Sequence, residues 1–259
     1  MHRTPALLVI ALLAGLPHAA DAAKSSCSAK SGEYTTALLE LYTSEGCSSC
    51  PPADEWLTRL PERQSVPEKV VPLALHVDYW NDLGWVDIYS QKKFSDRQSR
   101  RTFLNQTHSV YTPQVVLNGH ILPRWRQQAD AAILLVNATP AHADIALEIA
   151  RNTSRVDITV SVKTRRNYQG RTEMYVALYE RNLVRRIEAG ENRGRTLRHD
   201  FVVRELRGPV ELDKNGTGRF TPRVKLDKEW KQEDLGLAAF VQNRDTGEIL
   251  QTVALTLCR

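Results

Sequence analysis

The sequence predicts an α/β domain at residues 33–138, followed by an all-β sandwich domain at residues 142–259. Up to about residue 138, apolar runs of strand length alternate with segments of helical pattern, which is typical of an α/β layer. After residue 142, apolar residues recur at every second position in many short segments, which favours an antiparallel sandwich of the immunoglobulin-like kind. The polar, proline-containing segment 138–142 is the expected junction.

The first half is expected to alternate strands and helices. A helix at 51–60 opens with Pro51, which is tolerated there because its missing N–H would be unpaired anyway. Further helices are expected around 90–106 and at 127–137, and strands at 36–42, 70–77 and 114–118. The last strand ends in Asn118-Gly119, a turn signal.

The second half is expected to consist of strands without a strong helix. Turn chemistry at 214–216 and 244–247 separates neighbouring apolar segments. The expected strands are 145–149, 156–162, 174–179, 201–206, 220–226, 237–242 and 249–257.

Residues 1–23 have the parts of a secretory signal peptide. A short basic start, His2-Arg3, precedes the apolar segment 6–16, and small residues surround Asp21. That segment is too short for a membrane span, which needs about 20 residues. We therefore expect a periplasmic or secreted protein with no membrane span after cleavage; an uncleaved anchor is the alternative.

Charge and composition narrow the classes of partner. The chain has 35 Lys and Arg against 30 Asp and Glu, a formal net charge of +5. This mild excess falls short of the basic signature of a nucleic-acid-binding protein, so we expect no nucleic-acid partner. We also expect no resident cofactor.

Cys47 and Cys50 form a C-x-x-C motif between an expected strand and the helix that begins near Pro51. Cys47 then lies at or just before a helix N-terminus, where the helix dipole and free N–H groups stabilise a thiolate. Cysteines in this setting have pKa values well below the ordinary value of about 8.5. Cys47 is the expected catalytic nucleophile and Cys50 its resolving partner in thiol-disulfide exchange with protein or small-molecule thiols and disulfides. The direction and the substrate stay open.

The other two cysteines, Cys27 and Cys258, lie near the two ends of the chain. An even number of cysteines in an exported protein favours pairing, so a structural disulfide between Cys27 and Cys258 is expected. Two unpaired thiols are the alternative, because sequence does not fix connectivity. A zinc site built from all four cysteines is disfavoured by their spacing.

Two stretches of the first half resemble the thioredoxin superfamily. Residues 39–50 are similar to the strand, loop and helix entry of thioredoxin-type and glutaredoxin-type proteins, and residues 111–119 to the cis-proline loop and the strand after it. The resemblance covers about residues 35–138 and implies a thioredoxin-like domain. It also implies that Pro113 is the cis-proline and that the backbone of Thr112 faces the dithiol and pairs with an incoming peptide.

The sequence departs from ordinary thioredoxins at two places beside the dithiol. Ser48-Ser49 stands where thioredoxin has glycine and proline, and this dipeptide tunes the redox potential. Leu41 stands where thioredoxins place a buried acid, while Glu40 is one residue away and on the other face of the strand. Proton handling is therefore expected to differ.

The chain as a whole resembles an uncharacterised family of secreted bacterial proteins with a thioredoxin-like domain. The resemblance rests on residues 44–54, which contain the letters C-S-S-C-P-P-A-D, and on residues 76–85, 111–114 and 190–200. These motifs lie in both halves. Membership of such a family implies no established activity.

An aromatic insertion lies between Cys50 and the Thr112-Pro113 loop. Its residues His76, Asp78 and Trp80 follow the strand expected at 70–77, at the sheet edge where ligands tend to bind. With Thr112 and Pro113 they are the candidate substrate-binding residues, and His76 or Asp78 could move protons between Cys50 and water. The alternative is that the aromatics only cover the sheet edge and that His76 is a hydrogen-bonded structural residue.

Two other functions stay open. A copper-binding thioredoxin-like protein would use both cysteines and a histidine, for which His76, His108 and His120 are available, although we predict no metal ligand. A non-enzymatic secreted binding protein would use the Cys47–Cys50 bond as a staple and recognise its partner through the β domain.

The arginine-rich stretch 181–207 is expected to be a solvated loop between strands. Within it, His199-Asp200 would be a catalytic pair only if it folded against another site.

Overall fold

The computed structural model describes residues 25–107, 109–166 and 168–258. The predicted signal peptide, residues 1–23, lies outside this part of the chain, as does His108. Within the described residues, no helix combines the length and the apolar character that crossing a membrane requires.

The described part of the chain contains three α-helices, which all belong to the first half and lie near their expected positions: α1 Pro51–Thr58, α2 Lys92–Leu104 and α3 Trp125–Asn137. Short 3-10 turns occupy Leu60–Glu62, Asn81–Leu83 and Gln232–Asp234. Each α-helix has an apolar side that packs on the sheet, through residues such as Leu57, Phe94 and Ile133. The expected helices of the first half are thus confirmed.

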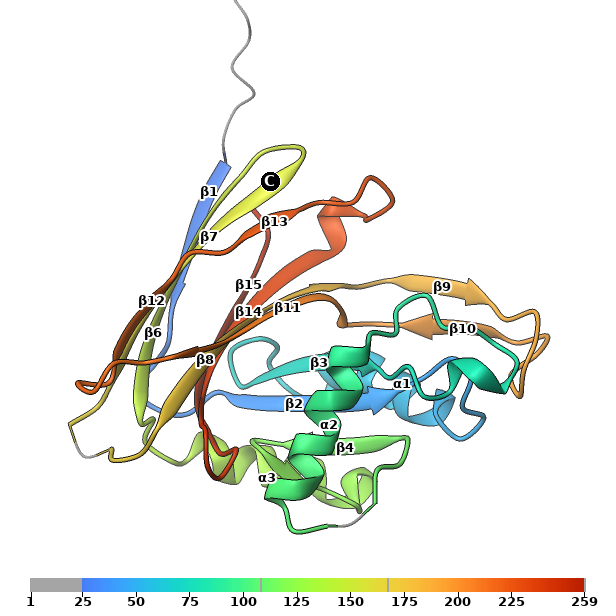
Figure 1. Cartoon of the computed structure of the whole chain (residues 1–259), viewed down its shortest axis with the longest axis horizontal. Helices are drawn as coiled ribbons and strands as arrows, with labels where there is room; N and C mark the ends of the chain where they lie inside the picture. The colour runs from blue at the N-terminus through green and yellow to red at the C-terminus, as the bar shows by residue number, and fades with distance from the viewer. Residues whose placement is uncertain (1–24, 108, 167, 259) are drawn as a thin grey trace, which may run out of the picture.

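Eight strands form one large mixed sheet (Figure 1). Its order is β15-β14-β8-β11-β3-β2-β4-β5, in which β2–β3 and β3–β11 are parallel pairs and the other pairs are antiparallel. The strands are β2 Ala37–Thr43, β3 Val70–His76, β4 Gln114–Leu117, β5 His120–Ile121, β8 Thr172–Glu180, β11 Val202–Glu211, β14 Leu235–Asn243 and β15 Ile249–Thr256.

A second, antiparallel sheet covers one face of the large sheet in the second half. Its order is β1-β6-β7-β12, with β13 also paired to β7. Its strands are β1 Ser25–Lys30, β6 Ala143–Arg151, β7 Arg155–Thr164, β12 Thr217–Phe220 and β13 Arg223–Lys225. Where one strand was expected at 220–226, Thr221 and Pro222 separate β12 from β13, since proline lacks the N–H that a strand ladder needs.

Strands β8 and β14 lie between two hydrophobic cores and contribute side chains to both. Successive side chains of a strand point to opposite faces of a sheet, and here both faces are buried. Met174, Val176 and Leu178 face the core between the two sheets. Tyr175, Ala177 and Tyr179 face the core that contains β2, β3 and the helices.

The large sheet therefore continues across the junction expected at 138–142. The link is the parallel pair β3–β11, in which Val202 lies opposite Ala74 and the Ala74 N–H donates to the Phe201 carbonyl at 2.8 Å. Strands of the second half thus extend the sheet of the first half. This arrangement brings residues near 200 to the end of β3.

The arginine-rich stretch differs from the expected loop. It contains the antiparallel ribbon β9 Leu183–Arg186 and β10 Thr196–His199, which reaches α1 (Figure 1). The alternating burial of β10, with Leu197 and His199 inward, gives the ribbon one packed face. The alternation is only four residues long, which is why the charged composition of the stretch masks it.

Candidate functional site

Cys47 and Cys50 form a disulfide at the N-terminus of α1. Cys50 is the residue that caps the helix, and its backbone already has helical dihedral angles. The preceding loop turns tightly, since the Cys47 N–H donates to the Ser44 carbonyl and the Cys50 N–H to the Cys47 carbonyl, both at 3.2 Å. Both cysteine side chains are buried, whereas Ser48 and Ser49 between them are exposed.

The Thr112-Pro113 loop and Trp80 lie beside this disulfide. The Ser49 hydroxyl donates to the Thr112 carbonyl at 3.5 Å, and the indole N–H of Trp80 donates to Oγ1 of Thr112 at 2.8 Å. The peptide bond between Thr112 and Pro113 is cis. Trp80 packs on Gly46, where an added Cβ would lie 3.2 Å from the Trp80 Cβ. Trp80, Thr112 and the two cysteines, far apart in the sequence, thus meet at one edge of the sheet.

The tip between β9 and β10 covers the other side of the disulfide loop. Asn192 is fully buried, and its Nδ2 donates to the carbonyls of Glu45 and Cys47, both at 2.9 Å. The carboxylate of Glu191 accepts from the Ser48 N–H at 3.0 Å, and the hydroxyl and the N–H of Ser48 together lower the pKa of Glu191. The second half of the chain therefore holds the C-x-x-C loop in place.

A set of five buried ionisable residues lies next to this loop, and we call it the buried cluster. Its members are Glu45, Asp54, His76, Asp87 and His199. They come from the loop before the cysteines, from α1, from β3 and the segment after it, and from β10. The rings of His76 and His199 meet edge to face, with their centroids 5.1 Å apart.

Within the buried cluster, His76 and Asp87 form an ion pair. Nδ1 of His76 lies 2.7 Å from Oδ2 of Asp87, which also accepts the Glu45 N–H at 2.9 Å. Burial opposes charge on both groups, but their mutual attraction outweighs it. The pKa of His76 is therefore raised and the pKa of Asp87 is lowered.

His199 lies between two acids of the buried cluster. Its Nε2 is 3.5 Å from Oε1 of Glu45, and its Nδ1 is 3.9 Å from Oδ2 of Asp54. Neither ring nitrogen has a hydrogen-bond partner among the described residues, and the same holds for Nε2 of His76. His199 therefore contacts the acids of the buried cluster through ion pairs that are longer than a hydrogen bond.

Asp54 is nearly inaccessible to water, with 5% of its surface exposed. Burial raises the pKa of its carboxyl group, while His199, His76 and the hydroxyl of Thr43 act in the opposite direction. The Thr43 hydroxyl donates to Oδ2 of Asp54 at 3.2 Å. Asp54 is thus a buried acid that holds its proton to a higher pH than an ordinary aspartate.

The structure separates the residues that the sequence grouped as a substrate site. Trp80, Thr112 and Pro113 lie on the outer side of the disulfide, and His76 lies in the buried cluster. Asp78 lies outside this cluster, because its carboxylate and its N–H both bond to the hydroxyl of Ser95 on α2. Of the two groups considered for proton transfer, only His76 is in the buried cluster.

Glu40 belongs to a different buried network. Its carboxylate pairs with Arg97 at 2.6 Å and with Arg101 at 3.0 Å, and both arginines also reach Gln242 of β14. Burial would raise the pKa of Glu40, but the two arginines more than offset it and hold the pKa below its ordinary value. Glu40 is therefore a charged structural group that ties β2 to α2 and to the second half.

Cys27 and Cys258 form the second disulfide, with a Cα–Cα distance of 5.8 Å. Both residues pack against the core between the two sheets. This bond joins β1 to the segment after β15 and takes no part in the arrangement around Cys47.

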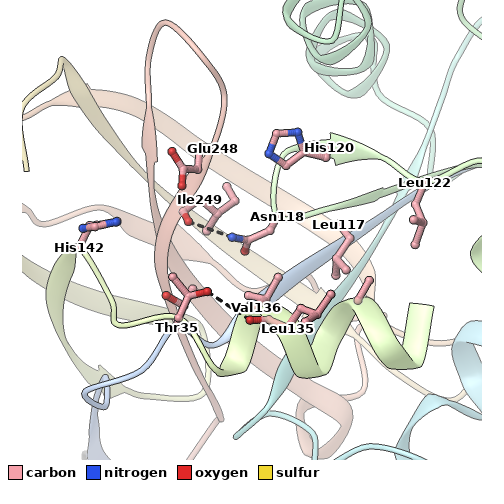
Figure 2. A pocket seen from close by; sticks show the side chains of 12 residues that line it. Thr35, Leu117, Asn118, His120, Leu122, Leu135, Val136, His142, Glu248 and Ile249 are labelled. Atoms are coloured by element: carbon pink, nitrogen blue, oxygen red, sulfur yellow. Dashed lines mark hydrogen bonds between the residues drawn. The ribbon is translucent and has the colours of Figure 1, made fainter. Parts of the chain in front are cut away.

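A cavity of about 340 Å³ lies at the opposite end of β2 from the cysteines. It is bordered by α3, the β4–β5 turn and the start of β15, with His120, His142 and Glu248 at its rim (Figure 2). His120 pairs with Leu117, which in turn lies opposite Leu39 near the start of β2. His120 is therefore not a neighbour of the dithiol. Among the described residues, no group of three or more His, Cys, Asp or Glu is arranged to hold a metal ion.

Sequence reasoning missed Asp54, Asp87 and Asn192 as site residues. Asp54 follows Cys50 by one helical turn, and this spacing puts both on one helix face. Asp87 and Asn192 give no comparable local signal, because their partners lie 42 and 145 residues away in the chain, respectively. His199 was noted in the sequence, but its neighbours depend on the β3–β11 pairing.

Comparison with known proteins gives a family and a fold. A family model described as "Protein of unknown function (DUF1223)" matches residues 38–242. No curated protein matches the chain. Among solved structures, a protein from Agrobacterium tumefaciens is similar, with 24% identity, a TM-score of 0.58 and coverage of 87% of this chain and 96% of that one. HBP35 of Porphyromonas gingivalis is similar with 16% identity and a TM-score of 0.64, over 88% of this chain and 76% of that one. At these identities the similarity extends to the fold alone.

Proposed function

The chain belongs to the DUF1223 family of proteins of unknown function, and we propose that it is an exported thiol-disulfide exchange protein with a thioredoxin-like site. Cys47 is the sulfur that reacts with the substrate and Cys50 the one that resolves the mixed disulfide. The observation that carries this proposal is the Cys47–Cys50 disulfide at the N-terminus of α1, beside the Thr112-Pro113 loop.

The setting of the two sulfurs supports different roles for them. Once the bond is reduced, the free N–H groups of the first turn of α1 and the helix dipole favour a thiolate on Cys47. Cys50 lies one helical turn before the buried acid Asp54 and on the same helix face, and this neighbour makes a negative charge on Cys50 less favourable. Cys47 is thus the better nucleophile and the better leaving group.

The exchange balances as follows. A substrate thiolate attacks the sulfur of Cys47, the Cys47–Cys50 bond breaks, and Cys50 leaves as a thiolate that takes up a proton. A second substrate thiolate then attacks the substrate sulfur of the mixed disulfide and releases Cys47 as a thiolate. The substrate dithiol loses two electrons and becomes a disulfide, and the protein gains them; the reverse sequence reduces a substrate disulfide.

The surface around the site favours a polypeptide substrate. Large apolar side chains are exposed in the two loops that meet at the Trp80–Thr112 hydrogen bond: Tyr79, Leu83, Val86, Ile88, Val110 and Tyr111. Exposed apolar side chains in one region commonly mark a surface that binds another chain. We therefore propose that the substrates are protein segments that carry cysteine beside apolar residues.

Two disulfides fit an oxidising compartment such as the periplasm or the outside of the cell. Thiols remain reduced in the cytosol, where such bonds are rare. The predicted signal peptide supports the same location. We propose a periplasmic or secreted protein on these two grounds.

The burial of both cysteines favours a second candidate, a binding protein in which this bond is only a staple. In that case Cys47 never reacts, and the tip between β9 and β10 keeps it closed. The two candidates differ in the chemistry of the reduced protein.

The test combines a titration with a trapping experiment on the protein that begins after the predicted signal peptide. If the protein performs exchange, millimolar dithiothreitol should reduce the Cys47–Cys50 bond. The Cys47 thiolate should then form well below the pKa of a free thiol, which is about 8.5. Exchange also predicts that reduced Cys50→Ser accumulates a mixed disulfide with an unfolded protein that carries a disulfide, because Cys47 attacks that bond and no Cys50 thiol resolves the product, whereas the matched variant Cys47→Ser does not. A bond that resists dithiothreitol, together with an ordinary pKa of the Cys47 thiol after forced reduction, would contradict exchange and would show that the bond is only structural.

A further inference from the structure

We propose that Asp54, which lies beside His199 of the second half, gives a proton to Cys50 when the disulfide opens and takes it back when Cys50 attacks. The inference rests on the proposed exchange function and adds the group that handles its proton. The strand before the motif supplies no such group, because Leu41 stands where thioredoxins place a buried acid.

Asp54 is placed for this role by the geometry of α1. Cys50 has helical dihedral angles, φ −78° and ψ −38°, and the Asp54 N–H donates to the Cys50 carbonyl at 3.1 Å. Residues four apart on a helix lie on one face, with their Cβ atoms about 5–6 Å apart. Asp54 and Cys50 are both buried, so bulk water does not compete at this face.

A proton carrier is needed there because a buried thiolate is unfavourable. Opening the disulfide leaves the negative charge on Cys50, and a buried anion without a partner is costly. The carboxyl group of Asp54 is the nearest acid along the helix, and burial raises its pKa toward the range in which it can exchange a proton with a thiol.

His199 lies beside Asp54 and connects it to the rest of the buried cluster. Its Nδ1 faces Oδ2 of Asp54 at 3.9 Å, its Nε2 faces Oε1 of Glu45 at 3.5 Å, and it has no other polar partner among the described residues. Glu45 in turn lies 3.3 Å from Arg185 of β9 and accepts the indole N–H of Trp85 at 2.9 Å. Arg185 and Trp85 are partly exposed, so this row of groups leads from Asp54 toward solvent.

The charged and titratable groups that face Asp54 and His199 come from every element packed on them. Strand β3 and the segment after it contribute His76, Asp87 and Tyr89. The loop before α1 contributes Glu45. The His76–Asp87 ion pair is internally neutralised. Asp54 is therefore the carboxyl group of this cluster that lies on the helix face of Cys50 and is not taken up by the His76–Asp87 pair.

The proton step balances in both directions. In the opening direction the Cys50 thiolate takes the proton of the Asp54 carboxyl, which becomes a carboxylate beside His199. In the closing direction that carboxylate takes the proton of the Cys50 thiol, and the thiolate attacks the mixed disulfide on Cys47. No electrons pass through Asp54 or His199.

The test follows the two sulfurs separately in the reduced protein. An excess of an aromatic disulfide with a coloured thiol product gives a first release when Cys47 attacks and a second release when Cys50 attacks. We expect Asp54→Asn to leave the first phase within about two-fold of wild type and to slow the second about 100-fold at pH 7, the usual contribution of a general base. The pH inflection of the second phase should also disappear.

Glu55→Gln is the matched control, because Glu55 is the next residue of α1 and is exposed. It should show wild-type rates in both phases. His199→Gln should keep the second phase but move its pH inflection, and it carries the test if Asp54→Asn does not fold. A second phase with the rate and pH profile of the control in both variants would overturn the proposal, while absence of any release from wild type would instead overturn the exchange function.

Discussion

At the scale of residues, the candidate site combines a disulfide loop, with exposed residues on its outer side, and a buried set of charges. Cys47 and Cys50 lie between the two, with Trp80 and Thr112 on the outer side and the buried cluster on the inner side. The ionisable groups inside cost free energy to bury, and within the cluster the shortest ion pair that offsets this cost joins His76 to Asp87 at 2.7 Å. Such an arrangement is typical of functional sites more than of structural cores.

The His76–Asp87 pair has a pH signature. The raised pKa of His76 gives stability that is complete below about pH 6.5, the unfolded value, and is lost as pH rises through the folded pKa. The lowered pKa of Asp87 gives stability that is present above about pH 3.9 and is lost as pH falls through its folded pKa. The pair therefore stabilises most between these two values.

We expect Asp87→Asn to lower the free energy of unfolding by about 3 kcal/mol at pH 5.5, because it leaves a buried imidazolium without its partner. The loss should shrink toward pH 8.5, where His76 is increasingly neutral. Urea unfolding of both proteins from pH 5 to 9 measures this. A difference between the two proteins that does not change with pH would contradict the proposed role of the ion pair. The control is Asp96→Asn, which removes the acid of an exposed pair with Lys92 and should lower the free energy of unfolding by less than about 1 kcal/mol.

At the scale of elements, the β9–β10 ribbon covers the C-x-x-C loop and binds it through hydrogen bonds. Its tip supplies Glu191 and Asn192 to the C-x-x-C loop, and its last residue is His199. A solvated loop, as expected from the sequence, would neither bind the C-x-x-C loop nor bring His199 into the buried cluster. The ribbon can hold this position because β10 packs on α1 and because β11, which follows it, is paired with β3.

We expect Asn192→Ala to make reduction of the Cys47–Cys50 bond by dithiothreitol about ten-fold faster. The substitution removes two buried hydrogen bonds to the loop, and a single such loss costs about 1–3 kcal/mol, where 1.4 kcal/mol corresponds to a factor of ten. Alkylation of released thiols, followed by mass spectrometry, gives the rate. Arg193→Ala is the control at the exposed neighbouring position; equal rates in the two variants would mean that the tip does not limit access to Cys47.

At the scale of the whole molecule, one sheet serves two cores. Strands β8 and β14 bury both faces, so the halves of the chain are not joined by a linker alone. The Glu40 network strengthens the same junction, since Arg97 and Arg101 of α2 bind both Glu40 of β2 and Gln242 of β14. The Cys27–Cys258 disulfide closes the other core, away from the site.

We expect the double variant Cys27→Ser/Cys258→Ser to lower the free energy of unfolding by up to about 4–5 kcal/mol, because the bond closes a very long loop. Both phases of thiol release should stay within about two-fold of wild type, since this bond lies in the other core. Urea unfolding and the kinetic assay measure the two quantities on the same samples. A parallel loss of exchange would show instead that the second core sets the geometry around Cys47.

The expected helices and most strands follow from periodicity, because the burial of one face imposes a 3.6-residue or a two-residue repeat on the sequence itself. Asn118-Gly119 forms the expected turn, with φ of 50° and 94° at the two residues. Strand β1 was not expected, because Ser25–Lys30 is short and largely polar and is held in place by pairing with β6. The ribbon β9–β10 was missed for a similar reason.

The sequence by itself determined the C-x-x-C motif, its place before a helix, and the order of the helices and of most strands, since each of these depends on residues close together in the chain. Only the tertiary structure decided what surrounds the dithiol. Asp54, His76, Asp87 and His199 meet because β11 pairs with β3 and carries β10 against α1. Such pairings between distant segments leave no periodic trace, because they depend on how whole sheets and helices pack rather than on any local spacing.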